Sequence, residues 1–563
     1  MAAGRDLRQG RRRPLPRQGI AGDPPAARLA PLAGPLPAAT AAVSDGGRRR
    51  GGLTGTVIRG VSLAGGGFLL GRAITLVTFV VLARLVTPEE LGQYTSGSVL
   101  VAFGVMLAGS GMLAALIHRE DRLDEAASTA TVATVGAGVV LALIGLASAP
   151  LIGTFFGSAT VGEVAAASAG ILLLQSARTV PNAILQRRFS FMRRLIVEPV
   201  AMLAFGVASI VATSQGLGVW GLVIGMYAQA AADVLLSWGL VRWRPRLRQV
   251  SFGMWRELVG YGRHVLAGST IRRFGDQVPV LVSGGMLNQS SVGQLQYANR
   301  IVTTPYSLLV AGIAYVIFPA FARIARDRSR FRPALLQTLR WSSVVAMPMG
   351  LILAPLGEPL AIIAFGERWS LAGEVTAAIC LYIPAQAIAA EIGEGFKAAG
   401  IPAKRTRVNA IAVAAGGLTM LALTPALGLF GVGIGISVDA VAGATVAIAL
   451  ARGAMEIPVR TVLAAVAPAA AAALLMIAVL FPVENLLVHA ADRGTALGLV
   501  LLAAEGLLGV AIYLLGLRIL APGLGTQLRD LLREARRRPG RGAAGRGADE
   551  ELVEEEGEGQ LPG

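Results

Sequence analysis

Long apolar stretches separated by short polar and basic segments run through the chain from about residue 55 to about residue 520. Fourteen of these stretches approach the length of about 20 residues that a helix needs to cross about 30 Å of hydrocarbon. Their centres fall near residues 70, 105, 138, 174, 205, 230, 275, 305, 345, 380, 413, 440, 471 and 505. The pattern predicts an all-α polytopic membrane protein with about 14 transmembrane helices, whose boundaries are hardest to place between residues 335 and 400.

The hydrophobic pattern also repeats within the chain. LGRAITLVTFVVLARLVTPEELGQ aligns without gaps on IRRFGDQVPVLVSGGMLNQSSVGQ, so that Arg72 matches Arg273 and Gly92 matches Gly293. A second match pairs LGVWG with LGLFG, 210 residues further along the chain. Two parallel copies of a multi-helix unit, each with an arginine inside an apolar stretch, indicate a transporter.

Composition agrees with the membrane class. Of the 563 residues, 54% are hydrophobic and 15% are charged, and the mean hydropathy is +0.63, which a soluble chain of this length would not tolerate. The net charge of +17 sits in short loops, so it is interpreted as setting topology, and no nucleic-acid partner is predicted. One cysteine, Cys380, and three histidines far apart in sequence give no disulfide, and no metal or cofactor is predicted.

The distribution of basic residues predicts the orientation. One set of alternate loops contains 23 Lys and Arg residues, whereas the opposite set contains 3, namely Arg84, Arg368 and Arg493. Basic loops stay on the cytoplasmic side. The chain is therefore expected to be a multi-pass protein of the cell inner (plasma) membrane with both termini in the cytoplasm.

The ends of the chain differ from its middle. The first segment is rich in Arg, Pro, Ala and Gly and contains no apolar run long enough for a signal peptide, and the last is Arg-rich and then acidic. Between the two groups of spans, Trp, Phe, Leu and Val alternate with arginines, as in a helix at an anionic interface. The expected domains are a disordered basic cytoplasmic tail at 1–54, an N-lobe at 55–241, a cytoplasmic amphipathic linker at 242–262, a C-lobe at 263–455, spans 13 and 14 at 456–520, and a disordered charged cytoplasmic tail at 521–563.

Arginines inside the spans carry most of the functional content. Arg72 falls near mid-depth of the first span, where its charge costs about 2.5–3.5 kcal/mol, so it is expected to face a polar cavity. In the seventh span, Asp276 is placed to pair with Arg272 or Arg273 and to leave the other one available. Arg300 lies in the eighth span. These four arginines are candidates for binding an anionic substrate; structural salt bridges, or snorkelling for Arg300, are the alternative.

Two acids of the tenth span, Glu391 and Glu394, are spaced to share one helix face. They could pair with the arginines or serve as proton or cation sites. The excess of arginine over acid in the first and seventh spans favours an anion, and a planar guanidinium suits phosphate because it donates two parallel hydrogen bonds. No GxxxxGK[ST] motif is present, so an ion gradient, the membrane potential or a partner is expected to supply energy.

Several segments resemble one transporter family, namely ARLVTPEELGQYTSGSVLVAFGVMLAGSGMLAALIHRED, PNAILQRRFSFMRRLIVEPVA, GLGVWGLVIGMYAQ and YANRIVTTPYSLLVAGIAYVIFPAFARI. Over roughly residues 55–455 the chain is similar to the oligosaccharide flippase branch of the multidrug/oligosaccharidyl-lipid/polysaccharide superfamily. The resemblance implies two pseudo-symmetric six-helix lobes in a V around a central basic cavity, with cavity arginines placed like Arg72 and Arg273. The two extra spans after residue 460 are more like the fourteen-helix lipid II flippase pattern.

The resemblance implies a flippase that moves polyprenyl-pyrophosphate-linked oligosaccharide from the cytoplasmic to the outer leaflet by alternating access, and no enzyme activity. Its expected partners are the lipid-linked glycan, membrane lipids and polysaccharide polymerase or ligase enzymes. Two alternatives remain open: a multidrug or organic-cation antiporter of the same superfamily, and a scaffold of a cell-envelope assembly complex. A membrane-embedded polymerase or ligase would need a larger outward loop than the pattern allows.

Overall fold

The computed structural model describes residues 70–119, 121–187, 191–324 and 328–523. The tail predicted at 1–54, and nearly all of the tail predicted at 521–563, therefore lie outside the described residues. All described residues belong to one compact unit, 58–563. Within them the secondary structure is helical and contains no β-strand, which confirms the all-α prediction.

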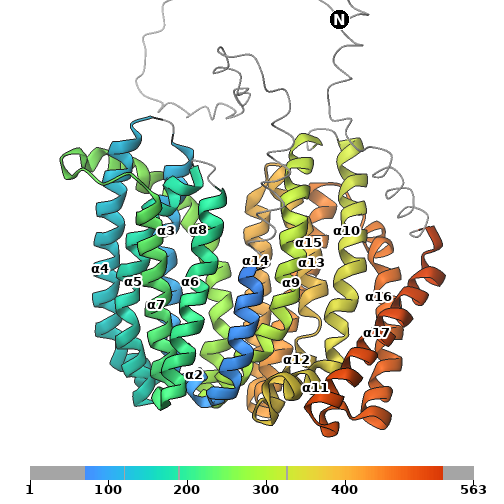
Figure 1. The fold of residues 1–563 in the computed structure, drawn as a ribbon. Helices are drawn as coiled ribbons and strands as arrows, with labels where there is room; N and C mark the ends of the chain where they lie inside the picture. Colours follow the sequence, from blue (N-terminus) through green and yellow to red (C-terminus); the bar gives the residue numbers. More distant parts are fainter. Residues whose placement is uncertain (1–69, 120, 188–190, 325–327, 524–563) are drawn as a thin grey trace, which may run out of the picture. The chain divides into compact units, whose positions relative to one another are not determined.

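The first described helix covers residues 70–85. The helices that follow, shown in Figure 1, are α2 (Pro88–Gly97), α3 (Val99–His118), α4 (Leu123–Phe155), α5 (Ala159–Arg187), α6 (Phe191–Ala212), α7 (Val219–Leu240), α8 (Phe252–Met286), α9 (Gln289–Ile324), α10 (Arg328–Leu351), α11 (Leu353–Phe365), α12 (Ser370–Ala378), α13 (Tyr382–Ala398), α14 (Pro402–Leu427), α15 (Leu429–Ala454), α16 (Val459–Pro482) and α17 (Thr495–Leu520).

Eight helical stretches within the described residues are long and apolar enough to cross a membrane. They match the spans expected near residues 138, 174, 205, 230, 413, 440, 471 and 505. Two bent pairs, α10–α11 and α12–α13, raise the number of spans to 10 if each pair counts as one. The stretches expected near 70, 105, 275 and 305 are helical as well but are not among these eight, so a total of 14 stays a prediction.

Proline explains both bent pairs. The pair α10–α11 bends by 54° and the pair α12–α13 by 47°. Pro355 cannot donate a backbone hydrogen bond to the carbonyl of Leu351, and Pro384 cannot donate one to the carbonyl of Cys380. Both breaks fall between residues 335 and 400, the region that the apolar pattern could not divide cleanly.

The hairpins α6–α7 and α14–α15 repeat the same turn. Gly218 precedes α7 with φ 49° and ψ −124°, and Gly428 precedes α15 with φ 56° and ψ −136°. Only glycine adopts this region of φ/ψ space readily. The second sequence match therefore corresponds to one backbone conformation used twice.

The helices α2 and α9 cross at a pair of glycines. A Cβ atom on Gly92 would overlap the backbone of Gln289, and a Cβ atom on Gly293 would overlap the backbone of Pro88. In the sequence alignment Pro88 matches Gln289, so each copy contributes the same surface to the crossing. A self-complementary contact of this kind is typical of two-fold symmetry, here between two segments of one chain.

The end of helix 70–85 is fixed to α11 and to the short turn Glu367–Trp369. The indole of Trp369 donates a hydrogen bond of 2.9 Å to the carbonyl of Ala83. Arg84 donates one of 2.9 Å to the carbonyl of Ile363. Carbonyls in the last turn of a helix have no partner within it, so Trp369 satisfies a group that would otherwise stay desolvated.

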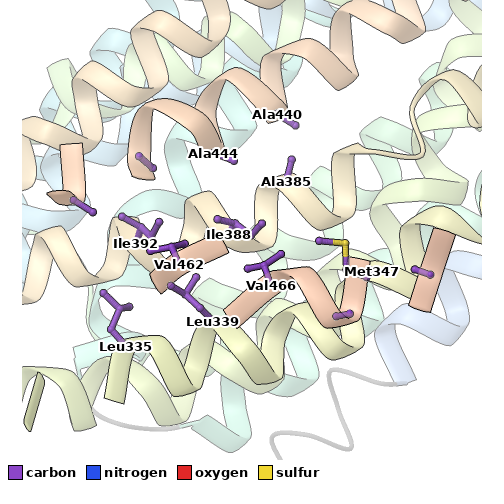
Figure 2. Close-up of a cluster of buried hydrophobic side chains, with 14 of the residues drawn as sticks. Leu335, Leu339, Met347, Ala385, Ile388, Ile392, Ala440, Ala444, Val462 and Val466 are labelled. Carbon is purple, nitrogen blue, oxygen red and sulfur yellow. The ribbon is translucent and has the colours of Figure 1, made fainter. Parts of the chain in front are cut away.

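The last two helices both pack on the rest of the bundle, α16 through a buried apolar cluster and α17 in part through Tyr513, whose hydroxyl donates to the carbonyl of Val344. Figure 2 shows Val462 and Val466 of α16 against Leu335 and Leu339 of α10. The same buried cluster takes in Ile388 and Ile392 of α13 and Ala440 and Ala444 of α15. Burial of branched apolar side chains from four helices holds α16 in place.

The second half of the predicted linker, 252–262, begins α8, which continues to Met286. Met254 and Leu258 are buried in a cluster with residues of α3, α4 and α5, while Phe252 is 75% exposed. The linker segment is therefore packed onto the helices that precede it and leaves part of its apolar surface uncovered.

Candidate functional site

A first cavity of about 250 Å³ lies among helix 70–85, α2, α6, α7 and α9. Its lining residues are Thr75, Thr78, Phe79, Leu82, Leu91, Tyr94, Met202, Phe205, Leu222, Gln229, Tyr297 and Arg300. Among these described residues none is acidic, and Arg300 supplies the formal charge. Aromatic and apolar walls around one cation produce a site in which that charge is poorly screened.

The guanidinium of Arg300 stacks on an aromatic ring. Its central carbon lies 3.7 Å from the ring centroid of Phe79, a cation–π contact. Tyr297 holds Phe79 in place because its hydroxyl donates a 2.8 Å hydrogen bond to the Phe79 carbonyl. Stacking uses the face of the guanidinium, while its N–H groups point outward in the plane, which is the geometry that binds phosphate oxygens.

Arg72 adds a second positive charge near the first cavity. It is half-buried and lies on the same helix as Phe79, and its charge acts on that of Arg300. Arg300 follows Gln289, the first residue of α9, by eleven residues, about 17 Å along the helix. Two arginines near one cavity favour an anionic ligand.

A second cavity, of about 220 Å³, lies among α8, α9, α13, α14 and α15. Its lining residues are Arg272, Gly275, Asp276, Val278, Pro279, Asn299, Thr303, Tyr382, Val413, Gly417, Met420, Ile436 and Asp439. Helix α9 thus contributes to both cavities.

The cation of the second cavity is balanced by acids. Arg272 pairs with Asp276 at 3.1 Å and with Asp439 at 3.2 Å. Two carboxylates around one guanidinium leave a formal charge of minus one when all three are ionised. The sequence predicted a partner for one of Arg272 and Arg273; the structure gives Arg272 two partners, one of them on α15.

The two cavities are equivalent parts of the two copies. Thr75 and Thr78 line the first cavity, and the residues aligned with them, Asp276 and Pro279, line the second. The equivalence explains why the cavities differ in charge, since a hydroxyl in one copy is replaced by a carboxylate in the other.

Arg273, the residue aligned with Arg72, is exposed and lines neither cavity. Its role as a substrate ligand stays a prediction. Arg300, for which snorkelling was the alternative, lies instead against Phe79 in the first cavity.

The two acids of α13 have different surroundings. Glu394 accepts from Lys397 and Arg405, each at 2.7 Å, so it is a partner of basic residues. Glu391 is 5% exposed, and within the described residues its Oε2 atom has no hydrogen-bond partner. Of the two acids, Glu391 therefore remains a candidate for binding a coupling ion.

Sequence reasoning did not single out the aromatic residues Phe79, Tyr94 and Tyr297 or the amide Gln229. The internal repeat could have identified them, because each lies on a helix that the two alignments pair with a helix of the other copy. The arginines were found because a charge is unusual inside an apolar stretch, and a neutral side chain in the same place is not unusual.

A family model described as polysaccharide biosynthesis protein matches residues 81–373. The chain is 25% identical over 319 residues to the succinoglycan biosynthesis transport protein ExoT of Rhizobium meliloti (strain 1021), covering 55% of this chain and 62% of that protein. It is 23% identical over 299 residues to the teichuronic acid biosynthesis protein TuaB of Bacillus subtilis (strain 168), covering 53% and 62%. These matches span about three fifths of the relatives' length.

Solved structures show the fold. The lipid II flippase MurJ in an inward closed conformation superposes with a TM-score of 0.67 at 16% identity, covering 82% of this chain and 99% of that one. An inward-facing multidrug resistance MATE family transporter of the MOP superfamily gives a TM-score of 0.57 at 16% identity, covering 68% and 94%. The resemblance drawn from the sequence is confirmed, and the chain belongs to the family of polysaccharide biosynthesis proteins.

Proposed function

We propose that this protein is a flippase that moves a polyprenyl-pyrophosphate-linked oligosaccharide from the cytoplasmic to the outer leaflet of the plasma membrane by alternating access. The observation that carries the proposal is the first cavity, which Arg300 lines, with Arg72 nearby, and whose described lining residues include no acid. A site for a cation would be expected to have an acidic residue in its lining.

The size of the first cavity indicates which part of the substrate it binds. Pockets that enclose a drug-sized molecule measure about 300–1,000 Å³, and this one measures about 250 Å³. We infer that it accepts the pyrophosphate group, while the glycan and the polyprenyl chain stay outside it. Arg300 would donate in-plane hydrogen bonds to phosphate oxygens, and Arg72 would add charge.

The proposed orientation has support in a third cavity, of about 470 Å³. It is lined by Arg84 and Arg368 and by Gly494, the residue after Arg493. The three basic residues assigned to the outer side by loop charge therefore lie in or next to the lining of one cavity. Their grouping supports the proposal that both termini are cytoplasmic.

A membrane potential would supply the energy. Moving one charge through 100 mV is worth about 2.3 kcal/mol, so an inside-negative potential would favour export of a dianion by about 4.6 kcal/mol per 100 mV. If the arginines move with the substrate, they neutralise it, and the potential acts instead on the return of the empty, positively charged site to the cytoplasmic side. Vesicles with a potential set by valinomycin test this, and transport that ignores the potential contradicts it.

Reconstitution tests the function itself. A fluorescent polyprenyl-pyrophosphate oligosaccharide is placed in vesicles with the protein, and an impermeant quencher reports exchange between leaflets. Wild type is expected to exchange the lipid between leaflets. The double variant Arg72→Gln, Arg300→Gln is expected to exchange it at least tenfold more slowly. Arg452→Gln, an exposed arginine in the last turn of α15, is the matched control and should exchange at the wild-type rate.

The second cavity favours one alternative, an organic-cation antiporter, because it combines Asp276, Asp439 and Tyr382. Acids and an aromatic ring suit a cationic ligand. Proton-driven cation export that is lost in Asp439→Asn, with no lipid exchange in wild type, would replace the flippase proposal. Absence of both lipid exchange and cation export in wild type would favour a scaffold.

A further inference from the structure

Two carboxyl groups are buried together at the last two helices, away from both cavities described above. Glu484 lies in a π-helical turn, Val483–Val488, that follows α16, and Glu505 lies in α17. Glu484 is 6% exposed and Glu505 is 3% exposed. Gly509 of α17 lies against Leu480 of α16, and Gly516 lies against Ala472. This antiparallel register places Glu484 beside Glu505, and the charge of Glu484 acts on Glu505. Glu505 is about 15 Å along α17 from Thr495, so it is buried well inside the span.

The hydrogen bonds of the two side chains are unequal. The backbone N–H of Ala490 donates to both oxygens of Glu484, at 3.0 Å and 3.3 Å. Within the part of the chain that the structure describes, no donor reaches either oxygen of Glu505. An ionised carboxylate only accepts hydrogen bonds, so two ionised groups would present acceptors to each other.

The surroundings offer no compensating charge. One turn beyond Glu505, Gly509 packs against Leu480, Met476 and Ile352, which makes the local environment apolar. In the described residues no basic side chain forms an ion pair with either glutamate. The titratable and charged groups on the neighbouring elements are Glu358 of α11, Glu374 beside it, and His489, Asp492 and Arg493 of the turn before α17.

Arg493 is exposed and directs its Nε atom to the carbonyl of Val488 at 3.2 Å. Arg493 therefore does not pair with either glutamate, while Glu358 and Asp492 add negative charge near Glu484. Two neighbouring carboxylates in an apolar region repel each other strongly, and the repulsion disappears when one proton is shared between them. Metal binding is a poor alternative, because no group of three or more His, Cys, Asp or Glu among the described residues could hold an ion.

We propose that Glu484 and Glu505 form a proton-binding site in which Glu505 carries the proton and its O–H donates a hydrogen bond to Glu484. The N–H of Ala490 stabilises the charge that remains on Glu484, so each group has the partner that its protonation state requires. Release of the proton would place a second negative charge one helical turn from Gly509, which lies against Ile352, the residue between α10 and α11. The proposal is independent of which substrate the protein moves, so it stands or fails separately from the flippase activity.

Infrared difference spectroscopy of the whole protein in lipid, recorded as the pH is changed, tests the site. Wild type is expected to show the carbonyl band of a buried protonated carboxylic acid that fades as the pH rises. Because Glu391 is a second buried carboxyl, Glu505→Gln should remove only the part of this band that Glu505 contributes, and it should keep the fold, because its amide N–H can still donate to Glu484. Glu163→Gln, an exposed glutamate of α5, is the matched control and should keep the band.

Other results overturn the proposal. A wild-type spectrum without the band, or a band of unchanged intensity and position in both Glu505→Gln and Glu484→Gln, shows that the pair holds no proton. A melting temperature that rises with NaCl but not with KCl in wild type, and not in Glu505→Gln, shows that the site binds sodium instead. Glu484→Gln separates a shared proton from one held by Glu505 alone, since only a shared proton shifts the band in this variant.

Discussion

Gln229 and Asp439 occupy equivalent positions in the first and second cavities, 210 residues apart in sequence. The amide faces a cavity whose arginine stacks on a ring, whereas the carboxylate forms an ion pair with Arg272 at 3.2 Å. This exchange of amide for carboxylate, together with that of Thr75 for Asp276, accompanies the change from a cationic cavity to one with a formal charge of minus one.

This relationship predicts unequal costs for the members of the ion-pair cluster. Arg272→Gln should destabilise the protein by about 1–3 kcal/mol, because it leaves two carboxylates near each other. Asp439→Asn should cost less, because Asp276 still pairs with Arg272. The double variant should be more stable than Arg272→Gln alone in thermal unfolding in detergent. Additive effects of the two substitutions would show that the groups do not interact.

The α2–α9 crossing predicts a steric effect. Gly92→Ala and Gly293→Ala should each cost about 1–3 kcal/mol, because an added methyl group meets backbone that cannot move aside. Gly136→Ala in α4 is the control, since its Cβ would meet nothing within 4 Å, and it should stabilise by about 0.5–1 kcal/mol. Thermal unfolding in detergent measures all three. Equal stability of the three variants would mean that the helices do not touch there.

The two hairpin glycines predict a conformational effect. Gly218→Ala and Gly428→Ala should each cost about 1–3 kcal/mol, because the L-residue is forced into backbone angles that glycine alone adopts readily. Gly239→Ala in the last turn of α7, where a Cβ finds open space, is the comparison. Fluorescence-detected thermal melts report the difference. Neutral behaviour at 218 and 428 would indicate that these turns rearrange at little cost.

The start of α8 predicts a response to acid. Glu257 pairs with Arg119 at 2.8 Å, and the hydrogen bond and charge of Arg119 hold the pKa of this carboxyl below its usual range. Its contribution is thus present above about pH 4.3 and is lost as the pH falls through the lowered pKa. High salt should weaken the contact at any pH.

A nitroxide label on a cysteine replacing the exposed Phe252, in a Cys380→Ala background, measures this response. Label mobility should rise on acidification in the otherwise wild-type protein. Glu257→Gln should show high mobility throughout the pH range. A label that becomes mobile at the same pH in both proteins would assign the change to another group.

The repeat could be predicted from the sequence to the level of single residues, because glycine at a close contact or a positive φ has no substitute. Gly92 matches Gly293, and the structure places both at one crossing. The second partner of Arg272, Asp439, could not be predicted in the same way. Asp439 lies 167 residues away, and only the packing of α15 on α8 brings the two charges together.

The bends were ambiguous for a different reason. Apolar composition continues through α10 and α11, so hydropathy alone does not mark Ile352 as a boundary; Pro355 does, through the hydrogen bond that it cannot make. The pair of Glu484 and Glu505 escaped notice because an acid in an apolar stretch shows its significance only when a second one is found beside it.

The continuity of α8 affects how the two copies of the repeat can move. Its first turns are buried among helices of the first copy through Met254 and Leu258, while Arg272, farther along the same helix, is bound to α15 of the second copy. Helix α8 therefore packs on both copies of the repeat. A displacement of one copy is transmitted to the other through this helix. Ligand binding in one cavity can thus affect the other cavity without any contact between the ligands.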